Sequence, residues 1–194
     1  MRKAGHTGAV CGIDFSDHVV QQLADKKGKG MSFQVMDARA LSFKDDSFDI
    51  VIDKGTIDAM LCAQDEDDRA VMLGFQNARH ICKEAGRVLG AAGYFVLVSH
   101  AGPETALGAK LLRECIMPGL LESQAVQEGQ PPPAWYINVH CSQAEVGMNE
   151  EQDKGEQDEG SPAVYIISKK PGRLTRSCFS KQISESFPIK CHMH

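Results

Sequence analysis

The chain has 194 residues, 42% of them hydrophobic, which is enough for one domain with a substantial core. Its net charge of −5 gives no support to a nucleic-acid-binding surface. The seven cysteines are scattered, with no Cys-x-x-Cys pair, and this favours reduced thiols in an intracellular protein over a disulfide framework or a zinc site. Because no apolar run of about 18 residues and no apolar signal core occur, we expect no membrane segment and a cytoplasmic location.

The first forty residues are typical of a strand, a helix and a second strand. Residues 9–15 form a short apolar run that contains Asp14 near its end, and Ser16 is placed to cap a following helix. Glycines at 28 and 30 end that helix. Residues 31–36 form the next apolar run, which Asp37 closes. Each predicted strand therefore ends beside a carboxylate.

The most informative stretch is Ser-Phe-Asp-Ile-Val-Ile-Asp-Lys-Gly-Thr-Ile-Asp-Ala-Met-Leu, residues 47–61. Residues 48–52 predict a buried parallel strand, because they are apolar and rich in β-branched side chains. The polar trio Asp53-Lys54-Gly55 breaks this run, and a helix-capable segment begins at Thr56. Ligands bind at the carboxyl ends of strands in open α/β sheets, so the trio is a candidate functional loop. The alternative is a simple strand-terminating turn.

The rest of the chain continues the alternation. An apolar stripe predicts a long helix over residues 67–89, ended by the glycine-rich residues 90–93, and a buried strand follows over 94–99. This spacing favours a parallel sheet with helices on both faces. Further on, residues 110–121 are compatible with a helix, and residues 135–140 and 164–168 with strands.

Two later segments lack the composition of a packed core. Residues 145–159 carry seven acids against one lysine, and we expect a disordered insertion at about 143–161 between two strands of a hairpin. Residues 130–133 read as a stiff proline-rich connector. We therefore expect one domain over residues 1–170 and a basic, poorly ordered tail over 171–194.

The carboxylates at Asp14 and Asp37 have a specific physical use. An acid at the tip of one strand can accept both ribose hydroxyls of an adenosine, and an acid one strand further out can accept the adenine amino group. Each acid alone also fits a turn or a helix cap. No metal site is expected, because the terminal Cys191-His192-Met193-His194 tract has no partner ligands.

At this point the chain resembles a family. Gly-Ile-Asp-Phe-Ser, the Asp37-Ala38 strand end, the 47–61 stretch and Arg-Val-Leu-Gly-Ala-Ala-Gly-Tyr-Phe-Val-Leu-Val-Ser-His are similar to class I S-adenosylmethionine-dependent methyltransferases. The segments Asp-Lys-Gly-Thr-Ile-Asp-Ala and Ser-His-Ala-Gly-Pro-Glu resemble, more narrowly, the lysine methyltransferases of elongation factor 1-alpha and of citrate synthase. The similarity covers residues 5–170 apart from the acidic insertion.

The resemblance implies site residues and a cofactor. Asp14, with Phe15 beside it, would hold the ribose of S-adenosylmethionine, and Asp37 and Ala38 would hold the adenine. The residues that would border the methionine end and the transfer site are Asp53, Lys54 and Gly55. We take Asp53 as the candidate catalytic acid, which would orient a substrate lysine amine; the alternative is that it only supports the loop.

The resemblance also implies a protein-lysine N-methyltransferase. The alternatives are a small-molecule methyltransferase and a non-catalytic interaction protein derived from one. A nicotinamide dehydrogenase would need a Gly-x-Gly-x-x-Gly loop, which the sequence does not contain. The sequence leaves the acceptor protein, the degree of methylation and the oligomeric state open.

The start of the chain departs from the family pattern. Members begin their sheet with a strand and a Gly-x-Gly loop whose amides receive the methionine portion of the cofactor, and no such strand and loop precede Asp14 here. We therefore expect a doubly wound, mostly parallel, Rossmann-like sheet that lacks its first, central strand and its glycine-rich loop. We also expect this chain to methylate poorly by itself.

Overall fold

A computed structural model describes residues 8–26, 28–62, 68–124, 134–141 and 162–170. The fold divides into two compact units, residues 1–42 and residues 43–194, which we describe separately. The proline-rich connector, the acidic insertion, the tail and the Cys-His-Met-His tract lie outside the described residues. Among the described residues, no helix is long and apolar enough to cross a membrane.

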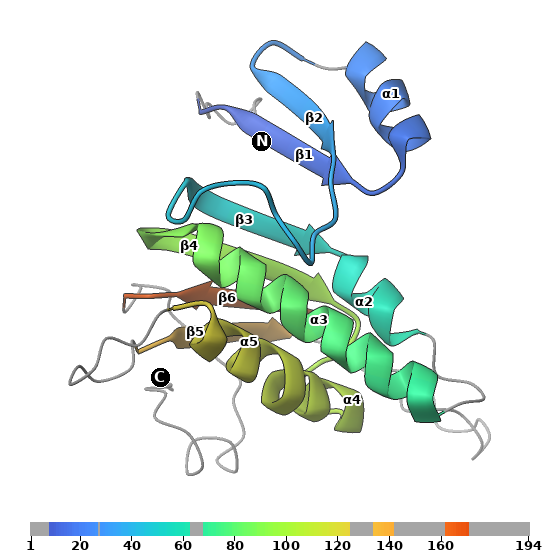
Figure 1. Ribbon diagram of the computed structural model, residues 1–194. Helices are drawn as coiled ribbons and strands as arrows, with labels where there is room; N and C mark the ends of the chain where they lie inside the picture. The colour runs from blue at the N-terminus through green and yellow to red at the C-terminus, as the bar shows by residue number, and fades with distance from the viewer. Residues whose placement is uncertain (1–7, 27, 63–67, 125–133, 142–161, 171–194) are drawn as a thin grey trace, which may run out of the picture. The chain divides into compact units, whose positions relative to one another are not determined.

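The first unit is a strand–helix–strand element, as the sequence predicts (Figure 1). Strand β1 (Val10–Asp14) pairs in parallel with β2 (Met31–Val35), and helix α1 (Asp17–Asp25) connects them. The side chain of Ser16 caps α1 by accepting a hydrogen bond from the Val19 amide. Only Val20 of the apolar face of α1 is buried.

The second unit contains a four-stranded sheet in the order β3-β4-β6-β5. Its strands are β3 (Phe48–Lys54), β4 (Leu89–Ser99), β5 (Tyr136–Cys141) and β6 (Ala163–Ser168). Strands β3 and β4 are parallel, whereas β6 is antiparallel to both of its neighbours. The sheet is therefore mostly parallel, with β6 as its reversed strand. The pairing of β5 with β6 confirms the predicted hairpin around the insertion.

Helices cover one face of this sheet (Figure 1). They are α2 (Thr56–Leu61), α3 (Asp68–Val88), α4 (Ala106–Lys110), the π-helix η2 (Leu111–Ile116) and α5 (Met117–Glu122). The core lies between these helices and alternate side chains of the sheet, among them Phe95, Leu97, Tyr165 and Ile167, all fully buried. Burying each such side chain contributes about 1.5–3 kcal/mol. Trp135 is also buried, as expected for a packing residue.

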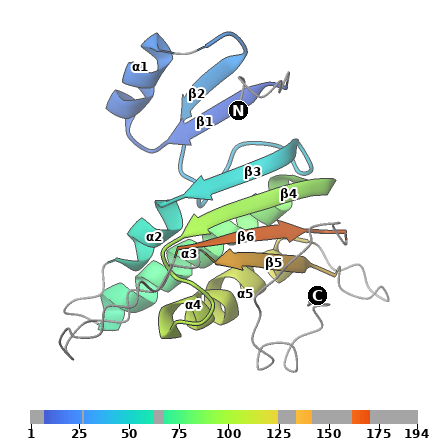
Figure 2. The ribbon, with the colours of Figure 1, turned by 180° about the vertical axis from the view of Figure 1, so that it is seen from behind.

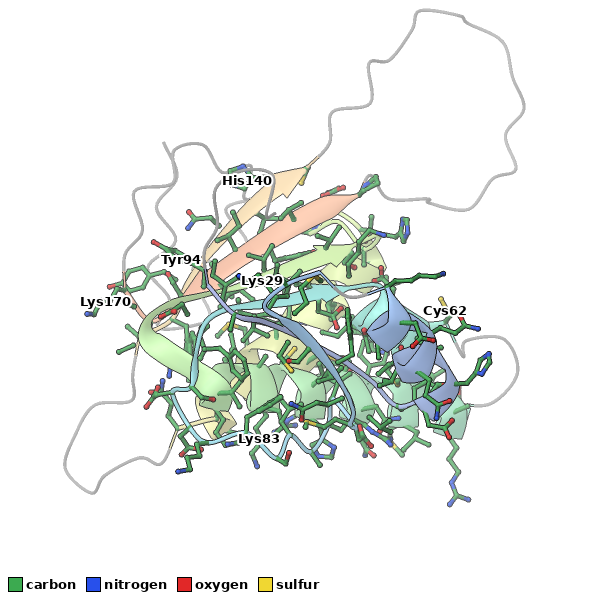
Figure 3. All side chains as sticks on the ribbon, turned by 90° about the horizontal axis from the view of Figure 1, so that it is seen from above. Lys29, Cys62, Lys83, Tyr94, His140 and Lys170 are labelled. Atoms are coloured by element: carbon green, nitrogen blue, oxygen red, sulfur yellow. The ribbon has the colours of Figure 1, made fainter. Side chains whose placement is uncertain are left out.

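The opposite face of the same sheet carries no described helix of this unit (Figure 2). Its side chains alternate with those of the core and are more exposed: Ile52 is 51% exposed and Tyr94 36%. Figure 3 shows Tyr94 and Lys83 of α3 on opposite sides of the sheet. The expected coverage of both faces is therefore not seen within this unit.

Two boundaries differ from the predicted ones. Strand β3 does not stop at Ile52, because Asp53 and Lys54 still pair with β4; only Gly55 leaves the strand. The helix ends before residues 90–93 as expected, but the strand expected over 94–99 already begins at Leu89, so β4 includes residues 90–93, which face a single residue of β3 between two register pairs. At both places, pairing with the neighbouring strand extends a strand beyond the apolar run in the sequence.

Strands β1 and β3 each have an unpaired edge. Among the described strands, β1 pairs only with β2, and β3 pairs only with β4, as β2 and β5 also have one partner each. The expected fold has one further strand between β1 and β3, so the pairing within each unit agrees with that expectation.

Candidate functional site

In the first unit, Asp14 lies at the carboxyl end of β1. Its Oδ1 accepts a hydrogen bond from the Ser16 amide at 2.9 Å, which is the expected turn contact. Its Oδ2 makes no hydrogen bond within the described part of the chain. The carboxylate therefore keeps free acceptor capacity. Phe15, the next residue, is 84% exposed.

Asp37 lies at the same edge, two residues beyond β2. The Met36 amide donates to the Asp14 carbonyl at 2.9 Å, so the two strand ends are adjacent. The Asp37 carboxylate accepts from the Arg39 amide at 2.8 Å and from the Arg39 guanidinium at 2.7 Å. Hydrogen bonding to Arg39 lowers the pKa of Asp37. The structure thus places Asp37 as expected, with both oxygens engaged by Arg39.

In the second unit, Asp53 and Gly55 build the turn from β3 into α2. Gly55 has a φ of +88°, a left-handed conformation that favours glycine. Asp53 is buried, and its Oδ1 accepts from the Ile57 amide in the first turn of α2 at 3.3 Å. Burial raises the pKa of Asp53, against hydrogen bonds from Ile57 and Thr56 that lower it, and the nearby Asp58 carboxylate raises it further. Asp53 therefore supports the turn and is also an acid held in a poorly solvated position.

A second acid, Asp58, joins this turn to the end of β4. Its Oδ1 accepts from the Ser99 hydroxyl at 2.6 Å, and its Oδ2 accepts from the His100 amide at 3.2 Å. The Ser99 oxygen in turn accepts from the buried Ala101 amide at 3.0 Å. Sequence reasoning missed this role of Asp58 and Ser99. Only Ser99 carried a signal, as a polar residue at a predicted strand end, whereas Asp58 lies within α2.

Strand β6 supports the same loop from the other side. The hydroxyl of the fully buried Tyr165 donates to the Ala101 carbonyl at 2.5 Å. Four residues after Ala101, Thr105 donates to the Gly102 carbonyl and caps α4 by accepting from the Gly108 amide at 2.9 Å. Asp58 thus joins the ends of β3 and β4 by partly exposed hydrogen bonds, and buried hydrogen bonds hold the loop after β4; such networks rigidify a site when every member is satisfied.

The remaining candidates have clear positions. Lys54 is exposed, Gly55 forms the turn, and His100 is exposed while its amide binds Asp58. Ala38 is half-buried beside Asp37. The structure describes no group of three His, Cys, Asp or Glu side chains that could hold a metal ion.

The chain is similar to known proteins over most of its length. Residues 1–155 match a family described as "Methyltransferase domain". A mouse protein named EEF1A lysine methyltransferase 4 is 33% identical over 96 residues, which are 48% of this chain and 38% of that protein. The eEF1A lysine and N-terminal methyltransferase of Xenopus laevis is 29% identical over 160 residues, which are 81% of this chain and 19% of that protein.

The chain spans less than half the length of these two relatives. A solved TehB-like S-adenosylmethionine-dependent methyltransferase from Corynebacterium glutamicum matches 84% of this chain and 68% of its own, at 15% identity and a TM-score of 0.47. The family match covers most of the chain, and the α/β fold, in which β6 is the strand that runs opposite to its neighbours, agrees with the fold class that the resemblance implies. The chain therefore belongs to the methyltransferase domain family, in the class I S-adenosylmethionine-dependent group, and resembles the lysine methyltransferases of elongation factor 1-alpha.

Proposed function

We propose that this chain is the catalytic part of a protein-lysine N-methyltransferase that uses S-adenosylmethionine. The observation that carries the proposal is the turn from β3 into α2, where the buried Asp53 and the anchored Asp58 lie at the carboxyl end of a parallel strand. The family is one of methyltransferase domains, and the names of similar relatives specify lysine of elongation factor 1-alpha and, for one of them, also the N-terminus. A cytoplasmic location fits such an acceptor.

The first unit carries residues that fit the adenosine part of the cofactor. Asp14 has an oxygen free to accept a ribose hydroxyl, and its position at a strand end is the one that ribose-binding acids occupy. Asp37 fits the adenine amino group only if Arg39 gives up one of its bonds, because Arg39 now occupies both oxygens. The Ala38 amide would complete the contact with the base, and Phe15 offers an exposed ring beside it.

In the second unit, Asp53, Lys54 and Gly55 would border the reacting end. S-adenosylmethionine supplies a methyl group on a positively charged sulfur, which is already activated for transfer. The chain itself must align a neutral lysine amine with that carbon and receive the positive charge that develops on nitrogen when the N–C bond forms and the S–C bond breaks. The new ammonium then loses a proton to solvent.

Asp53 is the proposed catalytic acid for this task. A carboxylate accepts a hydrogen bond from an amine and stabilises the cation that forms on it, and this effect is strongest where water is excluded. Burial at Asp53 provides such an environment. Asp58, Ser99 and the His100 amide hold the β4 loop against the same turn, and we assign them a positioning role.

Transfer of a tritiated methyl group tests the proposal. The chain is incubated with labelled S-adenosylmethionine and either purified eukaryotic elongation factor 1-alpha, a eukaryotic cell extract or a panel of small amines. Label in protein, recovered as methyl-lysine after acid hydrolysis, is the expected result, at the low level that we expect of this chain by itself. Label only in small amines would assign a small-molecule methyltransferase, and cofactor binding with no transfer to any acceptor would assign a non-catalytic binding protein.

A further inference from the structure

A hollow of about 460 Å³ lies on the outer side of the second unit, between α3 and the η2–α5 segment. Figure 1 shows α3, α4 and α5 next to one another on this side of the sheet. Its apolar lining is made by Val71, Met72, Phe75 and Pro118. Met72 is 58% exposed, whereas Phe75 is buried and forms the floor. We call this hollow the α3–η2 groove.

Charged side chains border the apolar floor in a defined place. The Lys110 ammonium lies 4.3 Å from the centre of the Phe75 ring, and Arg113 lines the groove next to it and is exposed. Within the described residues, neither cation has a carboxylate partner. Arg79, the third cation in the lining, is paired with Glu122.

Two acids, Asp68 and Glu114, also line the groove. Which charge the groove prefers in a ligand therefore depends on where each charged side chain lies, and not on the net charge. Because Lys110 lies over the Phe75 ring, an apolar side chain that enters beside it, against Val71 and Met72, brings its neighbouring residues within reach of Lys110. A carboxylate on those neighbours would be paired and an ammonium would be repelled. At this end of the groove, Lys110 and Arg113 therefore favour an apolar residue flanked by acids.

The groove is also connected to the Asp53 turn through one short helix. Gly74 of α3 packs directly on the last turn of α2, since a Cβ at this position would lie 2.3 Å from the Met60 carbonyl oxygen. Helix α2 has six residues and is therefore about 9 Å long. The groove and the turn are therefore formed by helices in direct contact, so one polypeptide that crosses α3 can occupy the groove and present another residue at the turn.

From these observations we infer that the α3–η2 groove docks the protein acceptor, by receiving an apolar side chain flanked by carboxylates. This inference rests on the proposed function, because it assumes a protein acceptor. Docking at a distance from the reacting lysine raises the affinity for the acceptor without adding to the chemistry. The groove would thus select the protein, while the Asp53 turn acts on the lysine.

A matched pair of variants tests the groove directly. Met72 and Leu73 are neighbours on α3 with similar exposure, 58% and 55%, but only Met72 lines the groove. The probe is a fluorescein-labelled, helix-forming synthetic peptide with two leucines four residues apart, each flanked by aspartate. Fluorescence anisotropy should show binding to the wild-type chain and to Leu73→Ser, and about tenfold weaker binding to Met72→Ser. Arg113→Glu should weaken binding similarly, and a peptide with lysine in place of aspartate should not bind.

The methylation assay provides the second measurement. The unlabelled acidic peptide should inhibit transfer to elongation factor 1-alpha competitively, without slowing transfer to a short lysine peptide. Met72→Ser should raise the KM for the protein and leave kcat unchanged. No binding by the wild-type chain, or equal binding by Met72→Ser and Leu73→Ser, would overturn the groove whatever the methylation result. Binding without inhibition would overturn its role in acceptor docking, and absence of transfer to any protein would overturn the proposed function separately.

Discussion

The hydrogen bonds of Ser99 allow a quantitative test of how the site is held together. In Ser99→Ala, Asp58 loses a short hydrogen bond of 2.6 Å and the Ala101 amide loses its acceptor. Asp58 is half-buried, so water replaces part of the first loss, but Ala101 is only 3% exposed and its amide is left without a partner. A hydrogen bond to a charged group contributes about 1.5–3 kcal/mol, and an unsatisfied buried donor costs about 1–3 kcal/mol. Since the two losses overlap, we expect a loss of about 2–3 kcal/mol in the free energy of unfolding.

Urea unfolding followed by circular dichroism measures this loss. In thermal unfolding, the melting temperature should fall by about 4–12 °C, because 1 kcal/mol corresponds to roughly 2–4 °C in a domain of this size. Ser47→Ala is the control: Ser47 is exposed and its hydroxyl bonds only the nearby Lys44 carbonyl, so its effect should stay within about 0.5 kcal/mol. Equal stability of the Ser99→Ala and wild-type chains would refute the proposal that Ser99 joins the two loops.

Four further predictions concern single positions. Asp14→Ala should weaken S-adenosylmethionine binding by about 1.5–3 kcal/mol in calorimetric titration, and unchanged affinity would remove Asp14 from the cofactor site. Gly74→Ala should lower the melting temperature sharply, because its Cβ would lie 2.3 Å from a backbone oxygen of α2; an unchanged value would mean that α2 and α3 pack differently. Burial raises the pKa of Asp53 above 3.8, so ionisation of this acid destabilises the folded state. Asp53→Asn should therefore gain stability relative to wild type as pH rises above 3.8. A difference in unfolding free energy that does not change with pH would contradict this. Iodoacetamide at pH 8 should modify the exposed Cys62 (Figure 3) long before Cys115, because burial raises the pKa of Cys115 to about 12. Mass spectrometry measures the order of modification, and modification of Cys115 first would contradict its burial.

The sequence predicted most of the elements, because hydrophobic period and capping residues are local signals. The long helix was expected over residues 67–89 and is observed over Asp68–Val88, and the cap at Ser16 is confirmed. Errors occurred where a neighbouring strand decides the structure. The strand expected to begin at Tyr94 begins at Leu89, because Leu89 also pairs with β3.

The candidate site was predictable in part for the same reason. Asp14, Asp37 and Asp53 follow strands, and the ends of parallel strands are predictable from sequence. The bond from Ser99 to Asp58 was not, because it joins residues 41 positions apart and depends on how α2 packs against β4. The contact between Arg39 and Asp37 is local in the sequence. Only the structure shows that Arg39 bonds both carboxylate oxygens of Asp37 and would therefore compete with a ligand for them.

Methyl transfer by an Asp53 variant tests the central claim most directly. Elongation factor 1-alpha is incubated with deuteromethyl-labelled S-adenosylmethionine and either the wild-type chain or Asp53→Asn, and the modified lysines are located by mass spectrometry. Circular dichroism first establishes that the variant is folded. We predict deuterated methyl groups on lysine with the wild-type chain and loss of most of that transfer with Asp53→Asn. Equal transfer by the two chains would contradict the role of Asp53, and transfer to residues other than lysine would contradict the proposed reaction.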